Sequence, residues 1–292
     1  MTSLPSGDLQ DFQQLVLLRG RELYRDLAWR NIRDPYAIWV SEVMLQQTQV
    51  SRVEGRWQRW LTRFPDLQAL AEATSYDVLD EWQGLGYNRR ALALKSAAQQ
   101  IVELGYFPSQ VEELVKLKGI GPATAGGIRA FAFNLHGVYL ETNVRTVFLH
   151  HLFPDAEGVP DSVLKPLVDQ TCPAGPDDPL CDPRTWYYAL LDYGAYLKRI
   201  HPNPSRRSKH HAKQSKFEGS HRQKRAEAVR ILLDDKQAAG EGLTADQLAR
   251  ILDEVELKAG RPVCDRKEVD RILEELNKEG FTESAGDMWY IR

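Results

Sequence analysis

The sequence predicts a mostly α-helical protein with a helical body over residues 1–217 and a small winged-helix domain over residues 218–292. Apolar residues recur at helical spacing along nearly the whole body, and no long alternating strand pattern occurs before residue 280. Three helical segments followed by a short hairpin end the sequence, which is a winged-helix pattern. The length of 292 residues also favours two domains, at about 150 residues each.

The helices of the body follow from this spacing. Asp34-Pro35 begins one, because proline fits the first helical turn, and apolar residues then continue to Met44. Apolar positions at i, i+4, i+7, i+8 and i+11 predict a helix over Val53–Phe64. A similar pattern predicts another over Leu92–Val102.

The winged-helix prediction depends on roughly the last 70 residues, a length that is enough for a small domain. Helices are expected over Arg225–Ala239, over Thr244–Val255 with Thr244 as N-cap, and over Asp265–Glu279. Two short strands, at residues 281–284 and 288–291, then form a hairpin around a Gly-containing turn. The alternative is a helical cap with a frayed end.

Composition excludes several classes of protein. No run approaches the roughly 20 apolar residues of a membrane span, and seven Trp and nine Phe argue against disorder. The first ten residues lack the features of a signal peptide, so a cytoplasmic location is expected. Three cysteines indicate a reducing compartment and exclude a four-cysteine cluster within one chain.

The net charge of -3 conceals a strongly basic stretch. Residues 198–225 hold ten Lys and Arg against one acidic residue, so this stretch carries +9 and the remainder -12. Such a block is either a solvated linker or a phosphate-binding stripe, and composition alone leaves both open. If it binds phosphates, Arg206, Arg207 and Lys209 are candidate contacts.

A glycine-containing turn separates two helical patterns in the string LKGIGPATAG, residues 117–126. Gly119 and Gly121 permit a tight turn, and Thr124 lies in the first turn of the following helix. A glycine turn at a helix N-terminus presents free N–H groups that suit a phosphate. A lone G-x-G is more often a simple connector, but the longer string resembles a helix-hairpin-helix, which binds one DNA backbone.

Two carboxylates are candidates for acid catalysis. Glu42 lies among apolar residues that include Leu45, and apolar surroundings favour the protonated form that a general acid needs, whereas an ordinary glutamate on a helix surface is the alternative. Glu141 precedes an apolar helix beside Asn143, where helix capping is a sufficient alternative explanation. Two carboxylates in different environments suit cleavage of a glycosidic bond. The adjacent Gln46 and Gln47 fit contacts with base edges or a gap in a base stack.

The strings DPYAIWVSEVMLQQTQV, GLGY, LKGIGPATAG and LETNVR, in this order and spacing, resemble the adenine DNA glycosylases of the MutY type. These belong to the helix-hairpin-helix superfamily that includes endonuclease III. The resemblance covers about residues 20–200. It implies two helical subdomains, one of six helices over about residues 31–134 and one from residues 1–30 and 135–217. The active site then lies in the cleft between them, where a flipped base enters.

The resemblance also implies roles for particular residues. Glu42 matches the acid that protonates adenine N7, Asn143 an Asn that arranges the site, and Gln47 a wedge in the base stack. Tyr87 matches a Tyr that stacks near the opposite base. The implied base pocket consists of Arg25, Trp29, Leu45, Ala123 and Tyr188. The implied DNA contacts add Gln46, Gly119, Gly121 and Thr124.

The sequence departs from the family at several of these positions. Glu141 stands where the family has Asp, Tyr188 replaces a Glu or Gln that faces the adenine amino group, and Asn88 replaces a second Tyr. Ala123 provides no amine for lyase chemistry. None of Cys172, Cys181 and Cys264 lies at the positions of the four cluster cysteines, so no iron–sulfur cluster and no other metal are expected. The family's 8-oxoguanine-recognising domain is replaced by the winged helix.

These features together predict a monofunctional DNA glycosylase of base excision repair that acts on double-stranded DNA with a mismatch or lesion. Adenine is the favoured base, with hypoxanthine, uracil or thymine in mismatches as alternatives. A monomer located at the nucleoid is expected. Two other functions stay open, namely a non-catalytic binder of DNA structures on a glycosylase scaffold and a regulator that acts through the winged helix.

Overall fold

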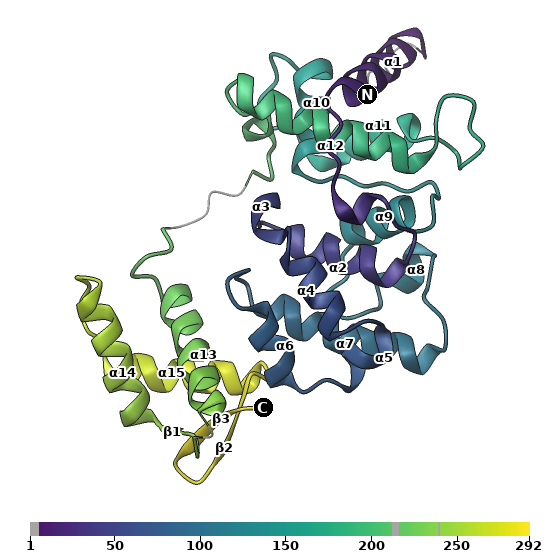
Figure 1. Cartoon of the computed structure of the whole chain (residues 1–292). Coiled ribbons are helices and arrows are strands. Elements are labelled where there is room, and N and C mark those ends of the chain that lie inside the picture. The colour runs from purple at the N-terminus through teal and green to yellow at the C-terminus, as the bar shows by residue number, and fades with distance from the viewer. Residues whose placement is uncertain (1–5, 212–215, 239) are drawn as a thin grey trace. The chain divides into compact units, whose positions relative to one another are not determined.

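The computed structural model describes residues 6–211, 216–238 and 240–292, and helices form nearly all of its regular structure (Figure 1). The predicted all-α class is therefore confirmed. The chain divides into two compact units. The first unit comprises residues 1–46 and 106–213, and the second unit comprises residues 47–105 and 214–292.

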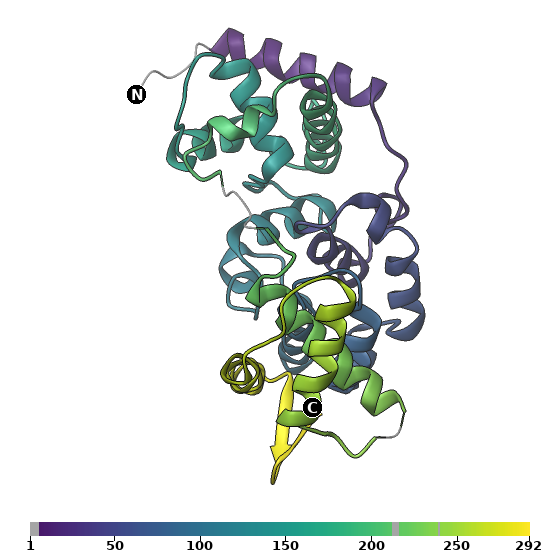
Figure 2. The ribbon, with the colours of Figure 1, turned by 90° about the vertical axis from the view of Figure 1, so that its left-hand side faces the viewer.

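The first unit is built around helix α12, which packs against both α1 and α10 (Figure 2). Phe12 of α1 contacts Phe148 of α10 edge-on, with ring centroids 5.1 Å apart, and also faces Trp186 of α12. The elements of this unit are α1 (Ser6–Glu22), η1 (Ala28–Arg30), α2 (Pro35–Leu45), α8 (Val111–Leu114), α9 (Pro122–Phe131), α10 (Thr142–Leu152), α11 (Asp161–Thr171), α12 (Pro183–Ile200) and η2 (Pro204–Arg207).

Helix α2 is buried on nearly every side. It begins at Pro35 as predicted, and the Asp34 carboxylate caps it by accepting from the N–H groups of Tyr36 and Ala37 at 3.3 and 3.1 Å. Eight of its eleven residues are buried, so a polar side chain in its middle lies in apolar surroundings. Glu42 is that side chain.

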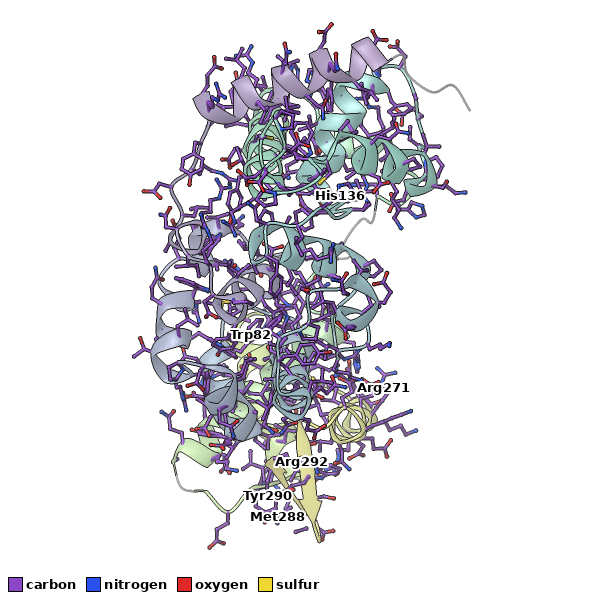
Figure 3. The ribbon with its side chains drawn as sticks, turned by 90° about the vertical axis from the view of Figure 1, so that its right-hand side faces the viewer. Trp82, His136, Arg271, Met288, Tyr290 and Arg292 are labelled. Atoms are coloured by element: carbon purple, nitrogen blue, oxygen red, sulfur yellow. The ribbon has the colours of Figure 1, made fainter. Side chains whose placement is uncertain are left out.

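The second unit contains helices α3 (Val50–Val53), α4 (Arg56–Arg63), α5 (Leu67–Glu72), α6 (Ser75–Trp82) and α7 (Arg89–Leu104). The prediction of a single helix over Val53–Phe64 is wrong. The helix is interrupted at Gly55, which adopts the left-handed φ of 77° and separates α3 from α4. Trp82, labelled in Figure 3, lies in the core of this unit with its ring 5.5 Å from that of Trp60.

The C-terminal part of the second unit has the predicted order of three helices and a hairpin. Helices α13 (His221–Gln237), α14 (Ala245–Lys258) and α15 (Arg266–Lys278) accompany strands β1 (Leu243–Thr244), β2 (Thr282–Ala285) and β3 (Met288–Ile291). The sheet is antiparallel in the order β1-β3-β2, with Trp289 of β3 opposite both Leu243 and Ser284. Met288 and Tyr290 alternate with Trp289 along β3 (Figure 3).

The compact units follow a different division from the predicted domains. Residues 47–105 group with the C-terminal residues 214–292, so the predicted six-helix subdomain over about 31–134 contributes to both units. The division at residue 217 stays a prediction. Among the described residues, no helix has both the length and the apolar character needed to cross a membrane.

Candidate active site

Glu42 has the environment of a general acid. Burial raises the pKa of its carboxyl to about 7, and the nearby negative charge of Glu141 raises it further. A hydrogen bond from Tyr139 and the charge of Arg30 oppose this rise without cancelling it. The pKa of Tyr139 itself lies well above 10, mainly because the ring is buried, so its hydroxyl keeps its proton and donates to Glu42.

Glu141 is both the N-cap of α10 and a neighbour of Glu42. Its side chain accepts from the N–H groups of Asn143 and Val144, the latter at 3.0 Å. Burial raises the pKa of Glu141, while these backbone hydrogen bonds and the charge of Lys198 on α12 counteract the rise. The capping explanation is therefore correct, and it also fixes the carboxylate within electrostatic reach of Glu42.

Asn143 is held at the start of α10 by close packing against α12. A Cβ atom on Gly194 would lie 2.2 Å from the backbone oxygen of Asn143, so only glycine permits this approach. The side-chain oxygen of Asn143 is buried and accepts no hydrogen bond in the structure. Such an atom can accept a hydrogen bond from a water molecule or substrate hydroxyl.

A buried ion-pair network lies beside this site. Asp192 of α12 accepts from both guanidinium nitrogens of Arg30, at 2.7 and 2.8 Å, and from Arg25 at 2.5 Å. Arg30 and Asp192 are only 4% and 2% exposed, so each compensates the other's buried charge. Arg25 is thus tied to Asp192 while its side chain stays 36% exposed.

Tyr188 is enclosed by two flat groups. The Arg30 guanidinium lies 4.4 Å from its ring centroid, and Phe131 stacks on the ring with centroids 4.7 Å apart. Burial and the charge of Glu42 raise the pKa of the Tyr188 hydroxyl. Tyr188 is therefore electrostatically coupled to the acid. Of the other predicted pocket residues, Trp29 is buried, Leu45 is partly exposed and Ala123 is exposed.

The glycine-containing turn forms a helix-hairpin-helix between α8 and α9. Leu117 and Ile120 are buried, whereas Gly119 and Gly121 are exposed, and Gly119 has the left-handed φ of 78°. Gly121 is the N-cap of α9 and offers no side chain there, so the first N–H groups of α9 are open to a ligand. Gln46 donates to the Thr124 hydroxyl at 3.1 Å and thereby ties α2 to the start of α9.

Gln47 and Tyr87 belong to the second unit, and both adopt left-handed backbone conformations, with φ of 54° and 51°. Arg90 joins their loops by donating to the Thr48 hydroxyl at 3.2 Å and to the backbone oxygens of Leu85 and Gly86 at 3.1 and 3.0 Å. Left-handed non-glycine residues are uncommon and occur often at functional sites.

The basic stretch is anchored to the first unit along η2. Arg207 donates to the backbone oxygens of Leu149 and Pro154, so its guanidinium serves packing within the protein. Val159 pairs with Ser208, which holds the next residues in place. Arg206 and Lys209 are exposed.

The three cysteines are free thiols, and Cys172 and Cys264 are buried. Burial raises the pKa of Cys181 to about 12, which makes its thiol unreactive near neutral pH. Within the described ranges, no group of three or more His, Cys, Asp or Glu side chains has an arrangement that would hold a metal ion.

Sequence reasoning missed Tyr139, Arg30, Asp192 and Lys198, which complete the site around Glu42 and Glu141. It also missed Gly127 of α9, where a Cβ atom would lie 2.7 Å from an oxygen of Glu42. Only the glycine pair at 126–127 offered a signal, because two adjacent glycines within a predicted helix indicate a close approach.

Residues 40–169 match the family described as HhH-GPD superfamily base excision DNA repair protein. Two solved structures share the fold. A thermostable thymine-DNA glycosylase has a TM-score of 0.57 at 20% identity, with 65% of this chain and 87% of that chain covered. A trapped endonuclease III–DNA covalent intermediate has a TM-score of 0.52 at 17% identity, with 75% and 93% covered.

More similar sequences are adenine DNA glycosylases. The protein of Buchnera aphidicola subsp. Baizongia pistaciae is 32% identical over 175 residues, which cover 59% of this chain and 48% of that protein. The Mus musculus protein is 42% identical over 152 residues, covering 48% and 30%. The Mycobacterium tuberculosis protein is 38% identical over 149 residues, covering 50% and 49%. The chain thus spans at most about half the length of these relatives.

Proposed function

We propose that this protein is a monofunctional DNA glycosylase that removes adenine from mismatched double-stranded DNA. The observation that carries the proposal is the raised pKa of Glu42, beside Glu141 and Asn143 in one compact unit. The similarity to adenine DNA glycosylases supports adenine as the base.

In the proposed reaction, the adenine is flipped out of the duplex and Glu42 donates its proton to a ring nitrogen of the base. The bond between the sugar C1′ and the base breaks, and its electron pair leaves with the protonated base. Tyr139 then donates its hydrogen bond to the new Glu42 carboxylate, which stabilises the charge that appears there.

Glu141 stabilises the positive charge that develops on the sugar. Lys198 lowers the pKa of Glu141 and so favours the ionised form that this role requires. A water molecule adds to C1′ and gives its proton to the Glu42 carboxylate, which restores the acid and closes the cycle. The buried side-chain oxygen of Asn143 is available to hold that water.

DNA is bound through its backbone. The exposed turn at Gly119 and Gly121 offers N–H groups to a phosphate at the start of α9. Arg206 and Lys209 add positive charge in the stretch that carries +9 over residues 198–225. We propose that the protein acts as a monomer at the nucleoid.

We further propose that no iron–sulfur cluster takes part. Three cysteines are too few for the four thiolates that such a cluster uses in one chain. Iron analysis and the visible absorption spectrum of the freshly purified protein test this directly. Ala123 supplies no nucleophile, so lyase activity is not expected, and borohydride trapping on a nicked or abasic product tests that.

A regulator that reads DNA through the winged helix is less well supported. Residues 218–292 hold thirteen Lys and Arg against seventeen Asp and Glu. Their net charge is therefore negative, whereas a module that binds phosphates is expected to be positive. A sequence-specific footprint from the full chain would favour this alternative if it survives disruption of the helix-hairpin-helix turn and neutralisation of the basic residues at 206–209.

The decisive experiment is incubation of the purified protein with duplexes containing adenine, hypoxanthine, uracil or thymine in mismatches, followed by hot alkali. We expect strand scission at adenine in a mismatch, and none with Glu42→Gln, while that variant still binds DNA. Scission by Glu42→Gln would show that another residue is the acid. Binding without scission for every duplex would favour the non-catalytic alternative.

A further inference from the structure

We propose that Tyr187 of α12 is a positioning residue for excision and that it acts on Glu42 through Tyr139. Its hydroxyl holds the short segment over residues 137–139, from which the Tyr139 side chain reaches the acid. The inference rests on the proposed function, because it concerns how well Glu42 delivers its proton.

The Tyr187 hydroxyl bridges two backbone groups of this segment. It donates to the backbone oxygen of Gly137 and accepts from the backbone N–H of Tyr139 at 3.1 Å. Burial raises the pKa of Tyr187 well above 10, so the hydroxyl keeps the proton that it donates. Residues 134–141 form no helix or strand, so this side chain satisfies backbone groups that regular structure leaves unpaired.

The rest of the segment is fixed by α9. Arg129 donates to the backbone oxygen of His136 at 3.0 Å. A Cβ atom on Gly126 would lie 2.4 Å from the backbone oxygen of Val138, so the segment packs directly on the backbone of α9. Because its other residues are held in this way, loss of the hydroxyl on α12 bears mainly on the position of Tyr139.

Aromatic packing gives the Tyr139 ring its direction. The rings of Tyr139 and Tyr187 are both buried and meet edge to face, with centroids 5.4 Å apart and planes at 90°. Phe131 of α9 completes the cluster, with its ring 5.2 Å from that of Tyr139 and 6.4 Å from that of Tyr187. Tyr187→Phe therefore keeps the packing and removes only the hydrogen bonds of the hydroxyl.

From Tyr139 the effect reaches the acid. The Tyr139 hydroxyl donates to Glu42 and thereby lowers the pKa of its carboxyl. A hydrogen bond weakens steeply as its distance or angle departs from the optimum, so a displaced Tyr139 lowers this pKa less. A weaker bond also stabilises less of the charge that appears on Glu42 as the proton leaves.

Tyr187→Phe leaves the other charged and titratable groups of the site in place. The groups that face Glu42 are, among the described residues, Tyr139, Arg30, Glu141 and Tyr188. The Tyr187 hydroxyl itself lies against the Cys172 thiol and within electrostatic reach of Asp169. A change in the pH profile of this variant thus reports the contact between Tyr139 and the acid.

Single-turnover excision by the full chain is measured against pH on a duplex with mismatched adenine. We expect Tyr187→Phe to lower the rate below pH 6 by roughly 10-fold and to move the falling limb to higher pH, with DNA affinity unchanged. Tyr187→Phe added to Tyr139→Phe should change neither the rate nor the profile further, because both act through one hydrogen bond. Additive losses in the double variant would overturn the inference, and so would an unshifted profile in Tyr187→Phe.

A second readout needs no excision. The free energy of unfolding of each protein, minus that of its Glu42→Gln counterpart, follows the ionisation of Glu42 as the pH changes. In Tyr187→Phe we expect this difference to report a higher pKa than in the wild type. A curve identical to that of the wild type would overturn the inference, whereas a shifted curve without any excision would support the positioning and contradict only the proposed function.

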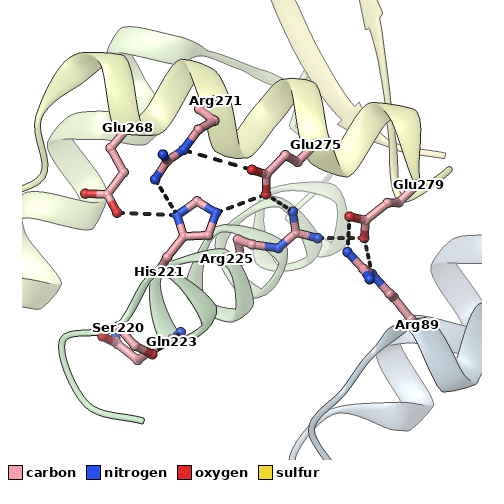
Figure 4. Close-up of polar contacts among 9 residues, drawn as sticks. All are labelled: Arg89, Ser220, His221, Gln223, Arg225, Glu268, Arg271, Glu275 and Glu279. Atoms are coloured by element: carbon pink, nitrogen blue, oxygen red, sulfur yellow. Dashed lines mark hydrogen bonds and ion pairs between the residues drawn. The ribbon is translucent and has the colours of Figure 1, made fainter. Parts of the chain in front are cut away.

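Two variants serve as controls. Tyr193→Phe is matched, because Tyr193 is a buried tyrosine of the same helix whose hydroxyl lies 2.8 Å from Nε2 of His151. Glu275→Gln controls for a general loss of stability, because Glu275 pairs in the second unit with His221 at 2.9 Å and with Arg225 (Figure 4). Both should keep the wild-type profile, and a shift in Tyr193→Phe equal to that in Tyr187→Phe would overturn the inference.

Gly126→Ala keeps the inference testable if Tyr187→Phe does not fold. The added Cβ atom would press on the backbone oxygen of Val138 and displace the segment from the side of α9. We expect the falling limb to move to higher pH, as in Tyr139→Phe. An unshifted profile would show that the position of this segment does not govern Glu42, and the inference would be wrong.

Discussion

Gly127 of α9 makes room for the Glu42 carboxylate. A Cβ atom at Gly127 would lie 2.7 Å from Oε2 of Glu42 and 2.9 Å from Cε2 of Tyr139, closer than carbon atoms pack in proteins. The glycine therefore permits the contact between the acid on α2 and the tyrosine that donates to it. This contact is possible only because α9 carries no side chain at that position.

We expect Gly127→Ala to reduce excision at least 10-fold, since misplacing a catalytic group by about 1 Å commonly costs that much or more. The helix itself should tolerate alanine, which is the better helix former by about 1 kcal/mol. Single-turnover excision rates and circular dichroism check both expectations. Adding Gly127→Ala to Glu42→Asp should cost less than the two single losses combined, because the shorter acid avoids the collision with the carboxylate and leaves only the one with Tyr139. Additive losses would contradict this explanation.

In the proposed reaction, the pKa of Glu42 sets the pH dependence of excision. With a pKa of about 7, the acid is protonated below neutral pH and loses its proton above it. We expect the single-turnover excision rate to be level below pH 6 and to fall roughly tenfold for each pH unit above 7. Tyr139→Phe removes the hydrogen bond that lowers this pKa, so the falling limb should move to higher pH. A profile unaffected by Tyr139→Phe would disprove that link.

Because of the same raised pKa, ionisation of Glu42 at high pH destabilises the folded chain. The folded-state pKa of about 7 exceeds the ordinary value of 4.5, so protonation favours the folded chain. The stabilisation is complete below pH 4.5 and is lost as the pH rises through 7, at most about 3 kcal/mol in all. We expect Glu42→Gln, which never ionises, to be more stable than the wild type at pH 8 and equally stable at pH 4. Denaturant unfolding at both pH values measures this.

Local sequence patterns indicated the apolar environment of Glu42 because its surroundings lie within one helix. The segment around Glu42 is apolar on every side, and the Asp34-Pro35 start is a strong local signal. The same is true of Glu141, which follows from its place before an apolar helix. Local signals of this kind require no knowledge of the tertiary fold.

The partners of these acids could not be predicted in this way. Tyr139 lies almost a hundred residues from Glu42, and Lys198 is more than fifty residues from Glu141. Their contacts depend on how α2, α10 and α12 pack, which no local pattern encodes. For the same reason, sequence reasoning assigned Arg25 to the base pocket and missed its buried neighbour Arg30, although both pair with Asp192.

Glu141 caps α10, and the proposed mechanism gives it a second, catalytic role that substitutions can separate from the first. Asn at position 141 keeps a good N-cap but carries no charge, so we expect Glu141→Asn to retain stability and lose about 100-fold in excision rate. Glu141→Ala should lose both, with about 1 kcal/mol of stability gone with the cap. Thermal unfolding and single-turnover rates distinguish these outcomes. Equal activity in Glu141→Asn and the wild type would remove Glu141 from the mechanism.

The basic residues of η2 and its flank divide into two kinds, and their variants should behave differently. Arg206 and Lys209 are exposed, so replacing either by Ala should leave the unfolding temperature unchanged and lower the salt dependence of DNA binding by about one phosphate contact. Arg207 donates to the backbone oxygens of Leu149 and Pro154, so Arg207→Ala should lower stability, by about 1–3 kcal/mol. Binding isotherms at several salt concentrations and thermal unfolding provide both measurements. A salt dependence lowered by about one phosphate contact in Arg207→Ala, without loss of stability, would show that its guanidinium contacts phosphate instead.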